Sequence, residues 1–469
     1  MAIDTAVPAE GTQSTPSTKT KPSIRDLFIF SFPNLPHSFV VLPLNIVIPQ
    51  FYAAHTKVTL LQIAAMTTSS RILDAVLDPT IGFLCDRTPE RFGRRKPWVF
   101  AAALVCSIAI FFLFQPNSQT QFLYYGVWSF LLYFGFSLFE IPRAAWTAEL
   151  SRDYVQRSRI NTYVAVLTVV GSLIFWLMPI ALSRFTGTMA ISGTALTGIA
   201  WLYVALMPAS VLLAILFVPS GDAPTHRLAT LRELFVSLRT NRPLWYYCGI
   251  IGAWGLSQGA FLSVSLIFIS DYMHMASAYP LMMIVFFVAQ AVAMPPWYRA
   301  VAKFGKHRVW AFSMFVDVIT RPLVLLVPLL GGLPILLVLT ALSAILNAPA
   351  YICPYAVLGD VVDYDLMRTR VNKAGNIFAF NTLLIKVTMA IGAGLSFTAL
   401  DLFHYHVGEH NSSTALTGLL LCYLVYPALL YFLAVVFAWR FPITANRHRA
   451  ILRRIAHSAP SVTDPAQHT

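Results

Sequence analysis

Long apolar stretches recur along the whole chain and are separated by short polar connections. Twelve of these stretches approach or exceed the roughly 20 residues that a helix needs to cross a bilayer. They lie at about 27–53, 58–85, 97–115, 120–150, 160–185, 195–218, 243–270, 277–300, 309–331, 333–358, 376–402 and 415–440. The pattern predicts an all-α membrane protein with twelve transmembrane helices.

The longest polar connection separates the first six spans from the last six. We therefore expect a disordered tail at 1–25, a six-helix bundle at 26–218, a central cytoplasmic loop at 219–242, a second bundle at 243–440 and a cytoplasmic tail at 441–469. The first tail is rich in Ser, Thr and Pro and has no apolar core, so it does not look like a signal peptide.

The two halves contain similar short sequences. FGRRKPW at 92–98 matches FGKHRVW at 304–310, and Glu140-Ile-Pro142 matches Asn347-Ala-Pro349. Two parallel six-helix repeats with a site between them at the midplane are typical of the major facilitator fold, which works by alternating access. The eighth span has no counterpart of the carboxylates in the second span, so we assign cation chemistry to the N-terminal half.

Composition supports the membrane assignment, since 57% of the residues are hydrophobic and only 11% are charged. The net charge of +13 comes from Lys and Arg in alternate connections, which places both termini in the cytoplasm and the protein in the inner membrane. The opposite connections hold only Lys57 and Arg184. The charge is therefore a topology signal, and we expect no nucleic-acid partner. The five scattered cysteines indicate neither a disulfide framework nor a metal site.

Charged groups inside the second span are the strongest functional signal. Arg71, Asp74 and Asp78 share one helix face, because residues three or four positions apart are neighbours on a helix. A carboxylate at the centre of a bilayer costs about 2.5–3.5 kcal/mol on insertion scales, so it is rare without a function. We expect a cation or proton site here. The alternative is a structural salt bridge with Arg71, which explains only one of the two carboxylates.

The fourth span adds three polar residues, which are Ser137, Glu140 and Arg143. Ser137 can supply a neutral oxygen to the cation, and Glu140 can accept hydrogen bonds from a substrate or carry a proton. Arg143 can hold an anionic substrate group. The alternative is a plain Glu140–Arg143 helix pair. Trp146, three residues after Arg143, is a candidate substrate contact.

Lys386 lies inside the eleventh span and needs a carboxylate partner, for which Asp74 and Asp78 of the other half are the candidates. The alternative is that its side chain extends to one membrane face. His37 follows two prolines in the first span and is a candidate substrate contact, although a hydrogen-bonded bundle histidine is the simpler explanation. Asp317 and Arg321 in the ninth span are expected to neutralise each other.

Opposed charges flank the predicted inner mouth of the two bundles. Asp86, Arg87, Arg94 and Arg95 follow the second span, and Asp360 and Asp363 follow the tenth. We expect these groups to form a cytoplasmic gate that breaks when it opens. The alternative is ordinary solvated loop charge.

These motifs together resemble the glycoside–pentoside–hexuronide:cation symporter family, whose members are similar to the melibiose permease. The resemblance covers about 25–440 and is carried by Arg71-x-x-Asp74-Ala-x-x-Asp78-Pro79, the Gly-Arg-Arg-Lys-Pro turn, Glu140-Ile-Pro142, Asp360-Val-Val-Asp363-Tyr and Lys386. It implies that Asp74, Asp78 and Ser137 form the cation site, that Glu140 bridges cation and sugar, and that Lys386 couples the halves.

The departures from the family pattern affect mainly the sugar-binding side. Leu77 replaces an asparagine that the family uses for sodium, which favours a proton as the coupling ion. Ala144 replaces a sugar-stacking tryptophan, no arginine occurs near Tyr163, and His37 or Ser38 lies where a sugar-binding aspartate would fall.

We therefore expect a monomeric secondary transporter that couples a small-molecule substrate, most simply a sugar or glycoside, to H⁺ or Na⁺ by alternating access. An amphiphilic or anionic solute such as a lysophospholipid is the alternative. A membrane-embedded enzyme or a sensor is a distant one, because no nucleophile–base set or output domain is evident. Apart from the coupling ion we expect no cofactor.

Overall fold

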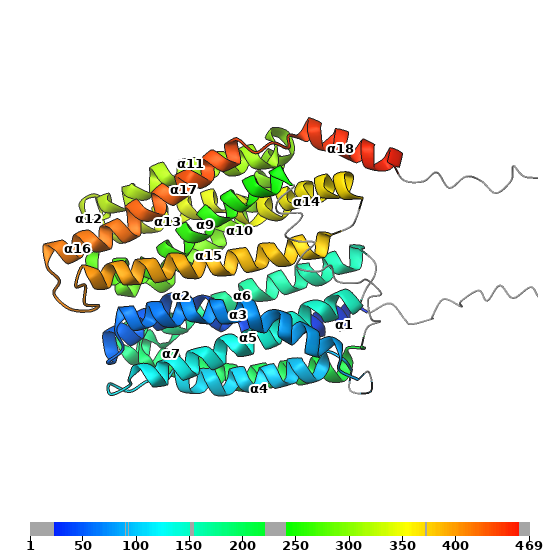
Figure 1. Ribbon diagram of the computed structural model, residues 1–469. Coiled ribbons are helices and arrows are strands. Elements are labelled where there is room, and N and C mark those ends of the chain that lie inside the picture. The colour runs from blue at the N-terminus through cyan, green and yellow to red at the C-terminus, as the bar shows by residue number, and fades with distance from the viewer. Residues whose placement is uncertain are drawn as a thin grey trace, which may run out of the picture.

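The computed structural model describes residues 23–89, 91, 93–150, 154–220, 241–370 and 373–458. In these residues all regular secondary structure is helical (Figure 1). The predicted tail at 1–25 and loop at 219–242 therefore lie largely outside the described residues. The helices of the first half are α1 Ile24–Ser31, α2 Asn34–His55, α3 Leu60–Asp86, α4 Lys96–Leu113, α5 Phe122–Leu150, α6 Tyr154–Thr186 and α7 Gly193–Phe217.

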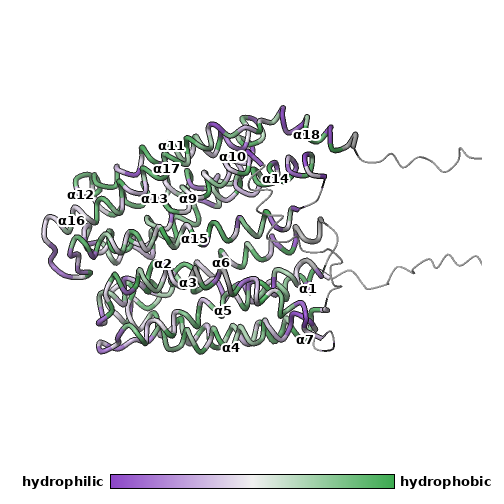
Figure 2. The backbone as a smooth tube through the Cα atoms, in the orientation of Figure 1, coloured by the Kyte–Doolittle hydropathy of each residue, from purple (hydrophilic) through white to green (hydrophobic). Residues whose placement is uncertain are grey.

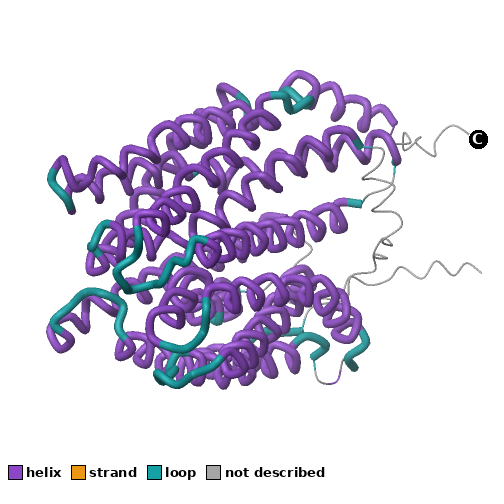
Figure 3. Tube along the Cα trace, turned by 60° about the vertical axis from the view of Figure 1, so that its left-hand side comes forward, coloured by secondary structure: helices purple, strands orange, loops and turns teal. Residues whose placement is uncertain are grey.

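The second half has the same kind of bundle with more interruptions. Its elements are α9 Arg242–Ile267, η2 Phe268–Tyr272, η3 Ala276–Ala278, α10 Tyr279–Phe304, α11 Lys306–Thr320, η4 Arg321–Leu326, α12 Val327–Leu330, α13 Leu333–Asn347, α14 Pro349–Thr369, α15 Ala374–Leu402, α16 Ser413–Leu420, η5 Leu421–Val425, α17 Tyr426–Trp439 and α18 Ala445–Ser458. Short loops join these helices (Figure 3).

Eleven helical runs in the described residues are long and apolar enough to cross a membrane, which confirms eleven of the twelve predicted spans by length and composition. The remaining span is α3, which has 27 residues and is therefore about 40 Å long. It contains Arg71, Asp74, Asp78 and Asp86, and it is the one predicted span that is not among these eleven runs. That α3 crosses the membrane stays a prediction.

Both ends of the described chain lie at one end of the bundle, which we call the terminus side (right in Figure 1), and the connections at 187–192 and 403–412 lie at the far side. Figure 2 shows hydrophobic residues along the helices and hydrophilic residues mainly at their ends. Many large apolar side chains are exposed on the flanks, among them Leu123, Phe185, Val292 and Leu329. Extensive exposed apolar surface is typical of sites that contact a membrane or another protein.

Helix α15 has a central position, because it packs on α9 in its own half and on α3 in the other half. Its approach to α9 depends on glycine. A Cβ added at Gly259 would lie 1.8 Å from the carbonyl oxygen of Met389, and one at Gly392 would lie 2.1 Å from that of Leu256. These glycines thus allow close helix packing, as we expect of small residues in membrane bundles.

Residues 445–458, within the predicted C-terminal tail, form the helix α18. It packs on α14 and buries Ile451, while its arginines remain exposed. Nε2 of His448 lies 2.8 Å from Asp363 and 3.3 Å from Asp360, which fixes the start of the helix on α14. The tail predicted at 441–469 thus contains a helix that the sequence analysis did not identify, and Ile451 and Ile455, one turn apart, give this helix an apolar face.

The glycine packing can be tested with two substitutions in α9. Gly259→Ala should lower the unfolding temperature and the folded yield, because the new methyl group collides with backbone that cannot move independently. Gly252→Ala is the matched control, since a Cβ there meets no atom within 4 Å. Thermal unfolding in detergent measures both. Equal unfolding temperatures for the two variants would contradict the packing.

Candidate functional site

The second-span carboxylates lie one helical turn apart on α3, which packs against α5. Asp74 is buried, and its Oδ1 accepts a long hydrogen bond of 3.5 Å from Oγ of Ser137 on α5. Oδ1 of Asp78 is buried with no hydrogen-bond partner in the described part of the chain. The structure thus brings Asp74 and Ser137 together and leaves a carboxylate oxygen of Asp78 available for a cation.

Lys386 of α15 reaches from the C-terminal half to both helices of this site. Its Nζ lies 3.4 Å from Oδ2 of Asp78 on α3 and 3.4 Å from Oε2 of Glu140 on α5. One ammonium group is therefore shared by two carboxylates of the other half. This contact joins the two bundles through charge, and it is the arrangement that the sequence predicts for Lys386 and Asp78.

His37 of α2 lies on the opposite side of Glu140. Its Nε2 is 3.5 Å from Oε1 of that carboxylate. The imidazole is held between the rings of Phe136 and Phe139, whose centroids are each 4.7 Å away. Glu140 thus contacts a histidine from α2 and a lysine from α15, and it connects three helices at one point.

Arg143 does not form the helix pair with Glu140 that was the alternative to a substrate contact. Among the described residues it makes no ion pair with Glu140, which is bound to Lys386 instead. Its guanidinium lies 5.9 Å from the centroid of the Phe139 ring, and its Nε is buried without a hydrogen-bond partner. The Glu140–Arg143 pair is therefore not the arrangement here. The side chain of Arg71 lies outside the described residues.

Trp146 lies away from this cluster. Its ring is only 2% exposed, packs edge-on against Phe30 with the centroids 5.2 Å apart, and donates a hydrogen bond of 3.1 Å to the carbonyl of Pro219. A solute cannot reach such a ring in this conformation. We therefore correct its assignment from a substrate contact to part of the N-terminal core.

The predicted gate residues are paired within their own halves. Arg95 lies 2.6 Å from Asp86 and 2.7 Å from Glu149, both in the N-terminal half. Burial opposes its charge, but hydrogen bonds with Cys85, Glu149 and Asp86 outweigh that effect and hold the pKa of Arg95 above its usual value.

In the C-terminal half, Asp360 lies 2.6 Å from Lys306, and Asp363 contacts His448. The guanidinium of Arg87 covers the Phe83 ring at 3.9 Å, and the carbonyl of Arg94 accepts a 3.9 Å contact from the Cys85 thiol. The expected contact of Arg95 with Asp360 or Asp363 is therefore not formed in this conformation.

Contacts on the far side join the two halves, and the sequence analysis did not identify them. Nε2 of Gln50 on α2 donates 2.7 Å to Oγ of Ser270 in η2, and the rings of Trp176 and Tyr279 pack 5.6 Å apart. Next to Ser270, Asp271 accepts hydrogen bonds from the hydroxyl of Tyr405 and from a backbone N–H. Burial, and then the charge of Asp271, raise the pKa of Tyr405. In the sequence, the only sign of these contacts is Asp271, an acidic residue at the end of the seventh span.

Residues 29–445 match the family described as MFS/sugar transport protein. The chain belongs to this major facilitator family. The resemblance to cation symporters and the twelve-span fold class inferred from sequence are thereby supported, with α3 as the one span not confirmed by composition.

The chain is similar to an uncharacterised symporter, YnaJ, of Bacillus subtilis. The two are 24% identical over 82% of this chain and 84% of the relative. Another is the sodium-dependent lysophosphatidylcholine symporter 1 of Gallus gallus, with 22% identity over 81% and 79%. Among solved structures, the nucleoside transporter NupG aligns with a TM-score of 0.65 at 14% identity, covering 89% of this chain and 99% of that one, which shows a shared fold.

The shared lysine can be tested by a double-mutant cycle. Lys386→Met should lower the unfolding temperature, because it leaves Asp78 and Glu140 close together without their common cation. Adding Asp78→Asn should recover part of the loss, with a coupling energy of about 0.5–3 kcal/mol. The low end is expected, since these side chains are 20–40% exposed and solvent screens them. Strictly additive shifts in thermal unfolding would contradict the ion pair.

Proposed function

We propose that this protein is a symporter that couples entry of a cation to uptake of a sugar or glycoside. This proposal rests on the Lys386 ammonium, which lies between Asp78 and Glu140. Asp78 belongs to the predicted cation site, and Glu140 belongs to the predicted substrate site. A shared counter-charge makes the occupancy of one site depend on the other.

In the proposed cycle, the ammonium of Lys386 contacts both carboxylates while the site is empty. A cation that binds at Asp74 and Asp78, next to Ser137, replaces the ammonium at Asp78. Glu140, which stays next to Lys386 and His37, then accepts hydrogen bonds from substrate hydroxyls beside His37 and Arg143. The two halves can rock only when all charges are neutralised, because an unpaired charge in a low-dielectric seam is costly.

We propose a proton as the coupling ion. A hard metal cation takes several oxygen ligands, and Oγ of Ser137 is one neutral oxygen that contacts this pair of carboxylates, at Asp74. Leu77 occupies the intervening position on α3 and offers none. A proton needs only one carboxylate oxygen, and the unpartnered Oδ1 of Asp78 fits that need.

We also propose that the terminus side faces the cytoplasm, because most Lys and Arg residues lie there. The protein would then lie in the inner membrane with both termini inside, as a monomer. With the far side joined by Gln50, Ser270, Trp176 and Tyr279, the described conformation would be the inward-facing one.

A lysophospholipid is the second candidate substrate. It is favoured by one relative, which is described as a lysophosphatidylcholine symporter. A lipid would need an apolar path for its chain, and competition of uptake by lysolipid or by a neutral sugar distinguishes the two substrates. Since the family transports solutes, we propose transport without chemical change.

The coupling role is tested by uptake into proteoliposomes under an imposed pH gradient, with a panel of radiolabelled sugars and glycosides. Asp78→Asn should abolish accumulation against a gradient, by at least about tenfold, while solute exchange without a gradient continues. Asp401→Asn makes the same chemical change at the end of α15 and is the control. Accumulation by Asp78→Asn at the wild-type level would refute the coupling role of Asp78. Accumulation driven by a sodium gradient alone would show that the coupling ion is sodium and not a proton.

A further inference from the structure

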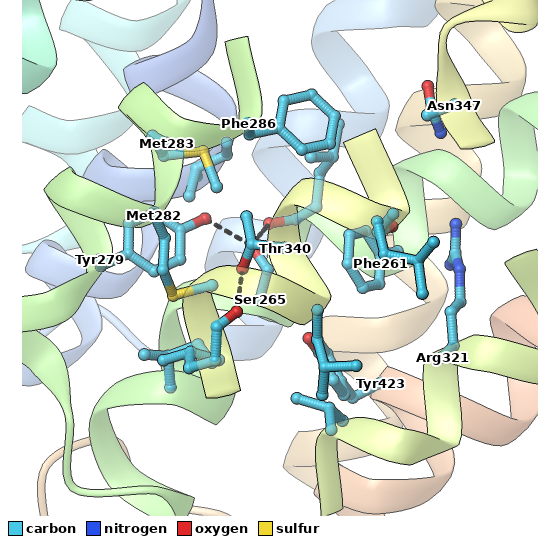
Figure 4. Close-up of a pocket in the computed structure, with 18 of the residues that line it drawn as sticks. Phe261, Ser265, Tyr279, Met282, Met283, Phe286, Arg321, Thr340, Asn347 and Tyr423 are labelled. Atoms are coloured by element: carbon cyan, nitrogen blue, oxygen red, sulfur yellow. Dashed lines mark hydrogen bonds between the residues drawn. The ribbon is translucent and has the colours of Figure 1, made fainter. Parts of the chain in front are cut away.

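A cavity of about 140 Å³ lies in the C-terminal half between α9, α10, η4 and α13 (Figure 4). Leu42 and Ile46 of α2 line part of it, so it also borders the N-terminal half. Engineered cavities of about 150 Å³ bind a single six-membered ring such as benzene. The residues that line the cavity include neither Lys386 nor any residue of the predicted cation site.

Arg321 supplies an unused hydrogen-bond donor to the cavity wall. Its Nε donates 2.7 Å to Oδ2 of Asp317, and its Nη2 donates 3.4 Å to Oε1 of Gln258. Its Nη1 is buried and has no partner in the described part of the chain, although the side chain is only 5% exposed. An unpaired buried donor costs about 1–3 kcal/mol, so a ligand that accepts this hydrogen bond is stabilised.

Asn347 supplies the complementary acceptor. Its Nδ2 donates 3.3 Å to the hydroxyl of Tyr431, while its Oδ1 is buried without a partner among the described residues. Figure 4 shows Arg321 and Asn347 on one side of the cavity and Tyr279 and Met282 on the other. One free donor and one free acceptor therefore occur on the same side of the cavity.

The charge of this polar side is already balanced. Asp317 neutralises Arg321, and its other oxygen accepts 3.1 Å from Oγ of Ser343. An anion bound here would add an uncompensated negative charge to a buried site, which is unfavourable. A hydroxyl group is neutral and is both a donor and an acceptor, so it satisfies Arg321 and Asn347 together.

The rest of the cavity is apolar and aromatic. Phe261 and Tyr423 stack with their centroids 5.1 Å apart, and Met282, Met283 and Phe286 lie across from Arg321 (Figure 4). Apolar faces beside a small number of convergent polar groups are typical of small-molecule sites. A sugar ring has this division, with C–H faces and hydroxyl edges.

We propose that this cavity is a subsite for one neutral pyranose ring, oriented by hydroxyl contacts with Nη1 of Arg321 and Oδ1 of Asn347. The subsite rests on the proposed function, since it specifies the chemistry of the transported solute. Asn347 is also the residue that matches Glu140 in the sequence repeat. Each half would then hold one end of the substrate, through Glu140 in one half and Asn347 in the other.

The test measures binding to the full-length protein in lipid nanodiscs by tryptophan fluorescence. The ligands are the methyl β-D-pyranosides of glucose, galactose and xylose and, as an anionic counterpart, methyl β-D-glucuronide. Arg321→Lys keeps the charge opposite Asp317 but removes the free N–H, and Asn347→Leu removes the acceptor. Gln115→Leu is the control, because that amide lies just past the end of α4, donates to the carbonyl of Phe111 and does not line the cavity.

Each of the two cavity variants should raise Kd for a neutral pyranoside about tenfold, the loss expected for one hydrogen bond, and Gln115→Leu should not. Wild-type affinities in both variants, no binding of any neutral pyranoside, or tighter binding of the glucuronide would each overturn the subsite. If the variant pattern holds but wild-type protein accumulates no pyranoside under a gradient, the subsite stands and symport fails.

Discussion

The structure depends on one physical constraint, which is that charges inside a membrane protein must be paired. In the described part of the chain, two carboxylates on one side of the seam between the halves, Asp78 and Glu140, share the ammonium of Lys386 on the other side. One cation cannot satisfy two carboxylates as well as two cations can. In the proposed cycle, the coupling ion that binds at Asp78 supplies a further positive charge.

The constraint also explains why α15 lies where it does. Gly259 and Gly392 let α9 and α15 approach until backbone touches backbone, so the position of Lys386 is set by rigid helix packing rather than by a flexible side chain. The same helix packs on α3. Any movement of one half against the other must therefore change the Lys386 contacts, and this links the charge balance to the conformational cycle.

Most of the membrane spans and the charged residues within them could be predicted from the sequence, because the length of an apolar stretch and the positions of charges are read directly from the residues. Other features could not. Trp146 follows Glu140 by six residues, about 600° of helical rotation, and so lies on a different face of α5. Arg95 and Asp360 find partners within their own halves, and sequence separation cannot rank such competing partners. The cavity beside Arg321 arises from several helices at once and leaves only Asp317 and Arg321 as a visible sign.

The central claim is that Lys386 and the coupling cation compete for Asp78. The most direct measurement is the half-saturating concentration of H⁺, and then of Na⁺, for thermal stabilisation of the purified wild-type and Lys386→Gln proteins. Removing the competitor should let the cation bind at a lower concentration in Lys386→Gln. An unchanged or higher half-saturating concentration would contradict the competition.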